Sequence, residues 1–315
     1  MLIVFKHSLL ENLRILTDTP FFILVILIEI FLSNYHHKGL YSVKETTTNF
    51  ILSIVNGGLD LLIRGAYFFV LVYCWNLRLT SINNSWIYWI TLVVLIDFTM
   101  YWLHRLEHDC RLFWAAHVTH HSAEHMNFSV ELRTSVFQPL YRFIFFIPLA
   151  LCGFKPVDIF LAYSFMQIWG LFVHTELINK LGWLEYLMVT PSHHRVHHAS
   201  NIKYLDRNMG MCLIIWDKFF GTFQKELNSQ EYEPIRYGLT KPMAKTDPFN
   251  IIFHEWTGIW KDVRGKGLNW KQRMGYLFRP PGWSHDKSKL TSNEMRELQD
   301  PHLSDNMPET KLTSV

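Results

Sequence analysis

The stretch from Trp86 to His108 reads WIYWITLVVLIDFTMYWLHRLEH and decides the fold of the chain. Residues 86–103 carry a single charged side chain, Asp97, and about 20 apolar residues let a helix cross the ~30 Å hydrocarbon core of a bilayer. His104 and His108 follow one helical turn apart, so both imidazoles lie on one side of that helix. The stretch therefore predicts a membrane helix that ends in a pair of metal-binding side chains.

Further apolar runs predict a multi-pass membrane protein. They are Phe21–Ser33, Phe50–Trp75, Tyr141–Phe154 and Val157–Val173. Phe50–Trp75 and Val157–Val173, like residues 86–103, approach spanning length, whereas the two shorter runs fit half-spanning or tilted segments. Asp60 and Arg64 stand one turn apart within Phe50–Trp75 and can pair. Buried helices of a soluble α-helical protein are the alternative, but Trp and Tyr at the run ends favour a membrane.

Composition narrows the function classes. Charged residues make up 18% of the 315 residues and the net charge is +3, which gives no indication of a nucleic-acid partner. The four cysteines stand far apart without a CxxC pair, which excludes a thiolate zinc framework. Lys and Arg gather after residues 86–103 and after His174, so the positive-inside rule places both regions in the cytoplasm.

Histidine is the residue whose placement stands out. Eleven of the 17 histidines fall between His104 and His198. His104 and His108 form the first box. The second box is His117-Val-Thr-His120-His121, and the third is His194-Arg-Val-His197-His198. His174 stands alone at the end of the last apolar run. Spacings of three and four residues place imidazoles on one helix face, as a metal site requires.

The number of histidines favours two ions. The three boxes supply eight imidazoles and His174 makes nine, whereas one octahedral ion takes at most six ligands. Nitrogen-rich sites suit Fe, Zn, Cu or Ni rather than Mg or Ca. His125 breaks the spacing and is left out, and the box spacing selects His194 over the adjacent His193.

Two alternatives of other classes stay open at this point. His104-Arg-Leu-Glu-His108 also fits HxxEH, the signature of a zinc peptidase in which Glu107 would be the general base. That hypothesis leaves most of the clustered histidines without a role. A membrane protein that binds metal without catalysis is the second alternative.

The three boxes resemble those of the fatty acid hydroxylase / sterol desaturase superfamily of membrane di-iron enzymes. The stretches Trp114–Ser135, His174–Asn201 and Leu213–Phe223 resemble its alkylglycerol monooxygenase branch, and the resemblance covers about residues 95–226. It implies membrane helices with a cytoplasmic, all-helical cap that holds two irons. The implied organisation is membrane helices in 1–94, a His-box catalytic domain in 95–226, a cytoplasmic extension in 227–299 and a flexible tail in 300–315.

The resemblance also implies the site residues. The implied ligands are His104, His108, His117, His120, His121, His174, His194, His197 and His198. Glu124, Asn127 and Asp206 match positions of the branch and are candidates to orient the ligand rings, as are Asn208 and Asp217. A helix cap or a salt bridge is the ordinary alternative for these side chains. The branch has Glu directly after the second histidine of the first box, whereas this chain has Asp109, a further candidate.

The implied activity is an O₂-dependent oxidation of a lipid CH₂, with ether-lipid cleavage as one form of it. Hydroxylation or desaturation of sterols, fatty acids or carotenoids is the alternative within the superfamily. The expected cofactors are two Fe ions, and zinc also suits imidazole sites. No haem or flavin signature is visible, so electrons must come from a reduced pterin or from a protein of cytochrome b5 or ferredoxin type. The sequence does not define the oligomeric state.

Overall fold

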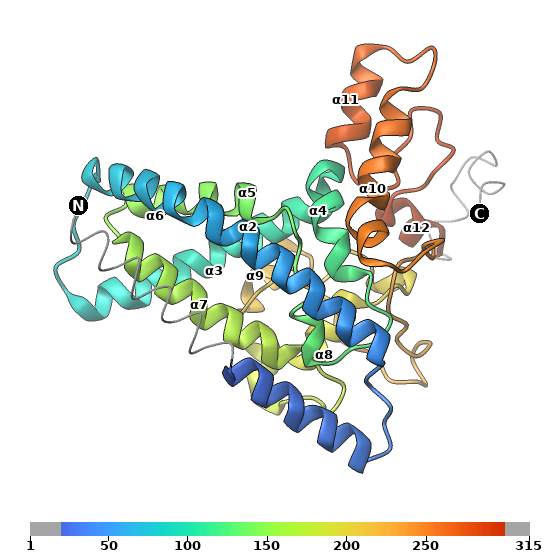
Figure 1. Cartoon of the computed structure of the whole chain (residues 1–315), viewed down its shortest axis with the longest axis horizontal. Helices are drawn as coiled ribbons and strands as arrows, with labels where there is room; N and C mark the ends of the chain where they lie inside the picture. Colours follow the sequence, from blue (N-terminus) through green and yellow to red (C-terminus); the bar gives the residue numbers. More distant parts are fainter. Residues whose placement is uncertain (1–19, 300–315) are drawn as a thin grey trace.

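The computed structural model describes residues 20–299, and in this range the regular elements are helices (Figure 1). The only extended pairing among these residues is an isolated bridge between Met188 and Leu213. The predicted all-α class is confirmed.

Three helices are long and apolar enough to cross a membrane, and they are the three that the sequence predicts to approach spanning length. They are α2 (Val43–Asn76), α3 (Ser85–Asp109) and α7 (Pro156–Val173). Ser42 caps α2 and Asn84 caps α3 with side-chain oxygens, which satisfies backbone N–H groups at the helix starts. The helix Pro20–Tyr35 is shorter. By length and composition, these helices fit an integral membrane protein.

The apolar run Tyr141–Phe154 is divided among short helical pieces. It forms α5 (Pro139–Arg142), the 3₁₀ turn η2 (Phe143–Phe146) and α6 (Ile147–Leu151). Pro139 and Pro148 lie at the starts of α5 and α6, where a missing N–H costs least. The run therefore packs beside α2 and α3 without spanning.

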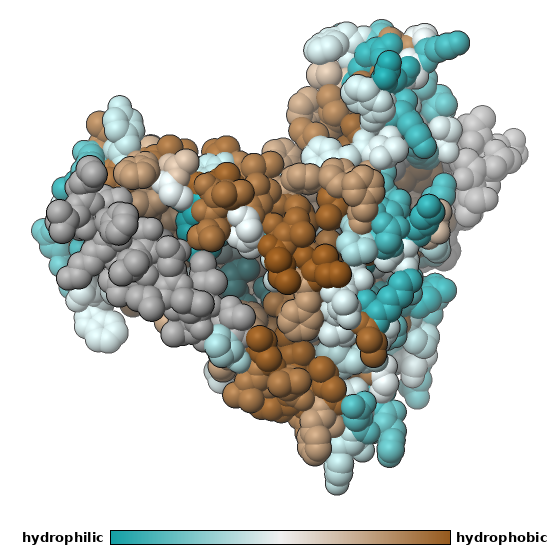
Figure 2. All heavy atoms as spheres, viewed as in Figure 1, coloured by the Kyte–Doolittle hydropathy of each residue, from teal (hydrophilic) through white to brown (hydrophobic). Residues whose placement is uncertain are grey.

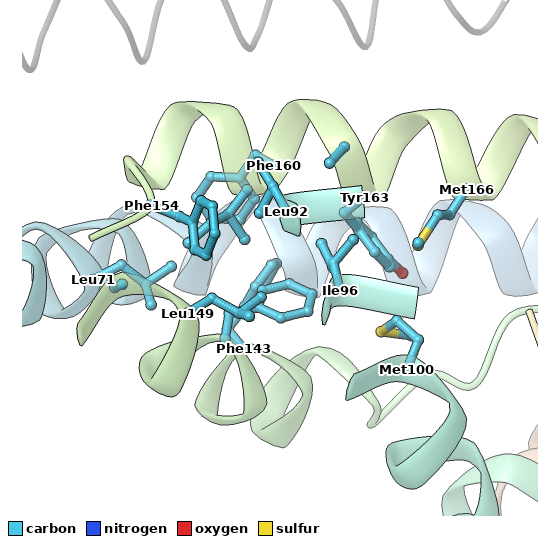
Figure 3. Packing of buried hydrophobic residues seen from close by; sticks show 14 of the residues in the cluster. Leu71, Leu92, Ile96, Met100, Phe143, Leu149, Phe154, Phe160, Tyr163 and Met166 are labelled. Carbon is cyan, nitrogen blue, oxygen red and sulfur yellow. The ribbon is translucent and has the colours of Figure 1, made fainter. Parts of the chain in front are cut away.

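The core of the membrane part lies between α2, α3, α7 and the broken run (Figure 3). Leu71, Ile96, Phe143 and Phe160 are among its buried members, and the aromatic rings of the last two lie 5.2 Å apart. The outward faces of the same helices are apolar too. Figure 2 shows this as brown surface along α2, as a lipid environment requires.

A buried ion network joins α2 to α5 inside this apolar region. Arg64 pairs with Asp60 as predicted, and Arg142 donates to the other oxygen of Asp60 at 2.8 Å. Charges at this depth are costly unless paired, so the network fixes α5 against α2.

The remaining helices form a cap at one end of the spanning helices (Figure 1). The first part comprises α4 (Arg111–His121), η1 (Phe128–Val130), η3 (Gly182–Tyr186), α8 (Pro191–His198), η4 (Ile202–Tyr204) and α9 (Ile215–Phe220). The second part comprises α10 (Pro248–Val263), α11 (Trp270–Phe278) and α12 (Ser292–Gln299). Since α10 packs on both α4 and α2, the C-terminal part is joined to the cap. The expected tail 300–315 lies outside the described residues.

Candidate metal centre

A single extended residue sets the angle between the helices that carry the first two boxes. α3 ends at Asp109 and α4 begins at Arg111, and Cys110 between them has φ −129° and ψ 117°. Extended backbone cannot continue a helix, so the chain turns there. α4 then packs beside the end of α3, which brings both boxes to the same space.

The third box lies on α8, whose start is defined by Thr190 and Pro191. Pro191 occupies the first helical turn, and Thr190 forms a capping box with His193. The ring of His193 also packs on Phe223, with the centroids 5.6 Å apart. His193 therefore serves the helix cap, and His194 is the first histidine of this box to face the others.

Nine histidines converge in two adjoining groups. The first group is His104, His108, His117, His121 and His197, and the second is His120, His174, His194 and His198. Within each group, one ring nitrogen of every residue lies within 4.8 Å of the others. The rings of His121 and His198 stack 4.5 Å apart, which places the two groups side by side. These are the nine residues that the sequence predicts as ligands.

Hydrogen bonds fix which ring nitrogen faces the centre. Backbone carbonyl oxygens accept from the Nδ1 atoms of several histidines, and a carbonyl oxygen cannot donate, so each such Nδ1 carries the hydrogen. The Nε2 of a neutral ring is then a free lone pair. The pairs are His104 with Met209 at 2.9 Å, His197 with Arg207 at 2.9 Å and His174 with Gly170 at 2.7 Å.

The free lone pairs lie unusually close together. Nε2 of His174 lies 2.8 Å from Nε2 of His194 and 3.2 Å from Nε2 of His120. His120 directs its own Nδ1 at the carbonyl oxygen of Arg133, so the 3.2 Å contact has no hydrogen to share. Two nitrogens bound at ~2.1 Å and at right angles to one ion lie about 3.0 Å apart. The contacts therefore fit the edges of a metal coordination shell.

The protonation state of the clustered histidines agrees with a role as metal ligands. Burial, and then the neighbouring imidazoles, lower the pKa of His121 and His194 well below the ordinary value for histidine. Burial likewise lowers the pKa of His174 to about 4. The rings are thus neutral near pH 7 and can bind a cation without first losing a proton.

Two inward nitrogens have no partner among the described residues. They are Nε2 of His108 and Nε2 of His197, and both are buried. A buried nitrogen without a partner loses the hydrogen bonds that it would make in water. Metal coordination would satisfy both atoms, so the residues fit the metal that the chemistry of the boxes implies.

A short loop after the third box holds three rings of the first group. Oδ1 of Asp206 accepts from Nδ1 of His108 at 2.8 Å, and the carbonyl groups that accept from His197 and His104 lie on the same loop. Asp206 has φ 50° and Asn208 has φ 56°. Asp and Asn tolerate this left-handed region better than most residues, which explains their presence at these positions.

Two further polar side chains hold that loop in place. Asn208 donates to the carbonyl oxygen of Gln224 at 2.7 Å. Asp217 accepts from the backbone N–H of Met209 at 2.6 Å and of Gly210 at 2.8 Å. Asn208 and Asp217 thus act on the histidines indirectly, through the carbonyl groups that they fix.

We expect Asp206→Asn to weaken metal binding. The amide keeps the size of the side chain but removes the charge that favours Nδ1–H of His108, and loss of such a partner typically costs roughly 10–100-fold in metal affinity. Competition against a chelator measures the change. The matched control is Asp109→Asn, because Asp109 is exposed and pairs only with Arg105 at 3.2 Å among the described residues. Equal losses in the two variants would contradict this role of Asp206.

Two buried carboxylates contact the ligand rings without having been singled out for that role. Oε2 of Glu107 lies 3.3 Å from Nδ1 of His117, and Oε2 of Glu131 lies 3.2 Å from Nδ1 of His174. Burial raises the pKa of Glu131 to about 8. A cation bound nearby would favour its carboxylate form, so metal binding would release a proton there. The sequence offered one signal, the position of Glu107 inside the first box.

Three candidate partners lie away from the rings. Asn127 caps η1 by accepting from the backbone N–H of Ser129, and its amide donates to the carbonyl oxygen of Leu40. The backbone N–H of Glu124 binds Glu45, and Asp109 pairs with Arg105 as noted. Within residues 20–299 no contact joins these three side chains to the nine histidines, so each has the ordinary cap or surface role.

His125 also lies outside both groups. Its Nδ1 lies 2.6 Å from Oε2 of Glu45, and its side chain is 42% exposed. The broken spacing that set His125 apart in the sequence therefore corresponds to a separate position in the fold.

Cavities adjoin the histidines on two sides. A narrow cavity of about 70 Å³ lies toward the spanning helices, and its lining includes Met100, Tyr163, His104 and His174. A larger one of about 850 Å³ lies toward the C-terminal helices. It is lined by four other histidines together with polar residues; these histidines are His108, His121, His197 and His198. The centre is thus reachable from the membrane part and from the cap.

Comparison with known proteins agrees with this geometry. Residues 89–222 match the fatty acid hydroxylase family. The chain carries a fatty acid hydroxylase domain. All nine histidines lie within the matched residues, and the resemblance predicted from the boxes is confirmed.

Relatives of the fatty acid hydroxylase domain include several lipid-modifying enzymes. The chain is 36% identical to human alkylglycerol monooxygenase over 281 residues, which cover 88% of this chain and 61% of the human protein. It is 32% identical to the Caenorhabditis elegans alkylglycerol monooxygenase over 78% of this chain and 50% of that protein. An ornithine lipid hydroxylase of Rhizobium tropici is 30% identical over 49% of this chain and 46% of its own length. No solved structure matches the chain.

Proposed function

We propose that the chain is an O₂-dependent di-iron monooxygenase that hydroxylates a lipid CH₂ next to an ether oxygen. The observation that carries the proposal is the pair of adjoining histidine groups at the ends of the spanning helices α3 and α7. The alkylglycerol monooxygenase relatives support the substrate class. Because the chain spans about 60% of the length of those vertebrate relatives, their activity is carried over here as a proposal.

The two groups would hold one metal ion each. The first group offers five imidazoles and the second offers four, and all-nitrogen sites of this kind suit iron, with zinc as a competitor in purified protein. Iron in these positions would supply the redox chemistry that activates O₂.

The protein's own residues position and shield the reaction. The loop that carries Asp206 fixes three rings of the first group, and Glu131 with the carbonyl oxygen of Gly170 fixes His174 in the second. The narrow cavity reaches both groups from the membrane side. A lipid entering there would present one carbon to the centre in a fixed orientation, with bulk water excluded.

The remaining requirements follow from charge and from the cavities. The basic residues near the cap support a histidine face that lies on the cytoplasmic side. An external reductant, either a reduced pterin or a small electron-transfer protein, supplies the electrons. The cavity of about 850 Å³ on the cap side offers access for it without crossing the lipid path.

Turnover with defined lipids tests the proposal. Iron-loaded full-length protein in nanodiscs receives O₂, a reductant and a 1-O-alkylglycerol, and mass spectrometry follows the products. Hydroxylation next to the ether oxygen gives a hemiacetal, which collapses to a fatty aldehyde and glycerol. Products from sterols or fatty acids, and none from the ether lipid, would favour the alternative within the superfamily.

Glu107→Gln separates the oxygenase from a zinc peptidase. The carboxylate of Glu107 accepts from the hydroxyl of Tyr141 at 2.6 Å and from the amide of Gln138 at 2.9 Å, and its other oxygen faces His117. Glu107 thus positions a ring and is not free to activate water. We expect the variant to retain both metals and part of its lipid turnover, measured by metal analysis and product formation. A peptidase would lose its general base and all hydrolysis of peptide substrates.

A further inference from the structure

The helices α10 and α11 project from the cap, across the direction of α2, α3 and α7 (Figure 1). One face of α10 is a stripe of four aromatic residues. Phe249, Phe253, Trp256 and Trp260 follow one another at intervals of four, three and four residues, which places them in line on a helix. We call these four residues the aromatic stripe.

Both ends of the aromatic stripe are exposed. Phe249 is 72% exposed and Trp260 is 62% exposed. The neighbouring helix α11 continues the apolar surface, since Trp270 is 71% exposed and Phe278 is 55% exposed. Large aromatic residues exposed on two helices that pack together are uncommon in soluble proteins unless they bind something.

The fold does not need the two ends of the aromatic stripe, because other residues of α10 anchor the helix to the cap. Ile251 and Ile259 are buried. Glu255 and Asp262 both pair with Arg111 of α4 at 2.6 Å. These contacts anchor α10 to the helix that carries the second histidine box and leave the ends of the aromatic stripe uncovered.

The aromatic stripe is continuous with the membrane-facing surface. Phe253 packs with Phe137 against Leu52 of the spanning helix α2, and the ring of Phe137 also lies 5.5 Å from that of Trp256. One turn along α2 from Leu52, Val55 is 44% exposed, and the neighbouring Ile54 is 73% exposed. In Figure 2 the side of the projection turned toward the spanning helices carries brown surface. The aromatic residues thus extend the lipid-facing surface sideways, at the level of the cap.

Basic residues accompany the aromatic ones. Arg264, Lys266 and Lys271 lie at the end of α10, in the connection and at the start of α11, and no ion pair holds them within residues 20–299. The guanidinium of Arg264 lies 4.8 Å from the ring centre of Trp260. Aromatic residues beside unpaired Lys and Arg are typical of helices that lie in the headgroup region of a bilayer.

We propose that α10 and α11 form an interfacial anchor that lies on the cytoplasmic surface of the bilayer, with the aromatic stripe and Trp270 buried among the lipid headgroups. The anchor ties the membrane surface to α4 through Arg111 and so fixes the cap relative to the bilayer. The occupant of the surface is lipid, and the basic residues favour anionic headgroups.

Photo-crosslinking to lipid tests the anchor. Benzoylphenylalanine replaces Trp260 or Trp270 in the full chain, reconstituted in nanodiscs of phosphatidylcholine and phosphatidylglycerol. Both positions are exposed and aromatic, so the replacement leaves the packing intact. Ile54 is the lipid-facing reference. Lys261 is the matched control, because it neighbours Trp260 but lines the large cavity of the cap. Mass spectrometry measures the lipid adducts.

We expect adducts at Trp260 and Trp270 at a level close to that at Ile54, and on the order of tenfold above Lys261. Lipid adducts at Ile54 alone would overturn the proposal. Cross-linked pairs of chains at Trp260 would also overturn it, because a second copy would then cover the aromatic stripe. Neither outcome depends on metal or turnover, so the result is separate from the proposed function.

Discussion

We expect His120→Ala and His197→Ala each to abolish lipid turnover and to lose the metal ion of the group to which the residue belongs. His120 belongs to the group of four histidines and His197 to the group of five, so the two variants test the two groups separately. Loss of a ligand should cost more than the roughly 10–100-fold in affinity that loss of an outer partner costs. Metal analysis after desalting and product formation in nanodiscs measure both effects.

The control for these variants is His36→Ala. His36 is exposed and packs beside Tyr35, far along the sequence from the boxes. It should keep full metal content and turnover. If His120→Ala and His197→Ala both retained wild-type iron and activity, neither group would be the reaction centre.

Arg133→Met should strongly destabilise the cap. The guanidinium is 2% exposed and holds the end of α4 by donating to the carbonyl oxygens of Thr119 and Ser122 and to the side chain of Asn49. Burial lowers its pKa to about 10, which leaves it charged near pH 7. Removing it leaves buried acceptors without a donor, at a cost of about 3–5 kcal/mol and a fall in Tm of roughly 10 °C.

Thermal unfolding in detergent measures this effect, and Arg236→Met is the matched control. Arg236 is exposed and pairs only with Glu233 of its own surface segment among the described side chains, so its loss should change Tm by no more than about a degree or two. Similar Tm values for the two variants would contradict the latching role of Arg133. Because His120 and His121 end α4, the Arg133 variant should also bind metal more weakly.

Much of the fold could be predicted from apolar run length and histidine spacing. The runs around Asp60 and Asp97 became α2 and α3 because neither helix contains a proline, and Asn84 marks the start of α3. The run from Tyr141 did not become one helix, because Pro148 interrupts it. Counting apolar residues finds such a run, but it takes no account of the backbone N–H that one proline lacks.

The histidine boxes predict which residues come together but not which of the two groups each histidine joins. The second box gives His117 and His121 to one group and His120 to the other, because α4 lies between the two groups. The placement of α4 depends on Cys110 and on Arg111, which binds α10, and these are tertiary features. Spacing alone therefore cannot assign a box to one ion.

The partners of the rings were predictable only in part. Asp206, Asn208 and Asp217 match the family pattern, and the structure places all three in or beside the loop that holds the first group. The backbone carbonyl groups that fix His104 and His174 have no side-chain signature, so no sequence pattern could have indicated them.

The metal content of the purified chain tests the central claim most directly. The full-length protein is loaded anaerobically with Fe(II), desalted, and assayed for iron and protein. Because the histidines form two separate groups, the expected result is two irons per chain, falling to about one in His120→Ala. A saturating value of one iron or fewer in the intact chain would contradict a dinuclear centre built from these nine histidines.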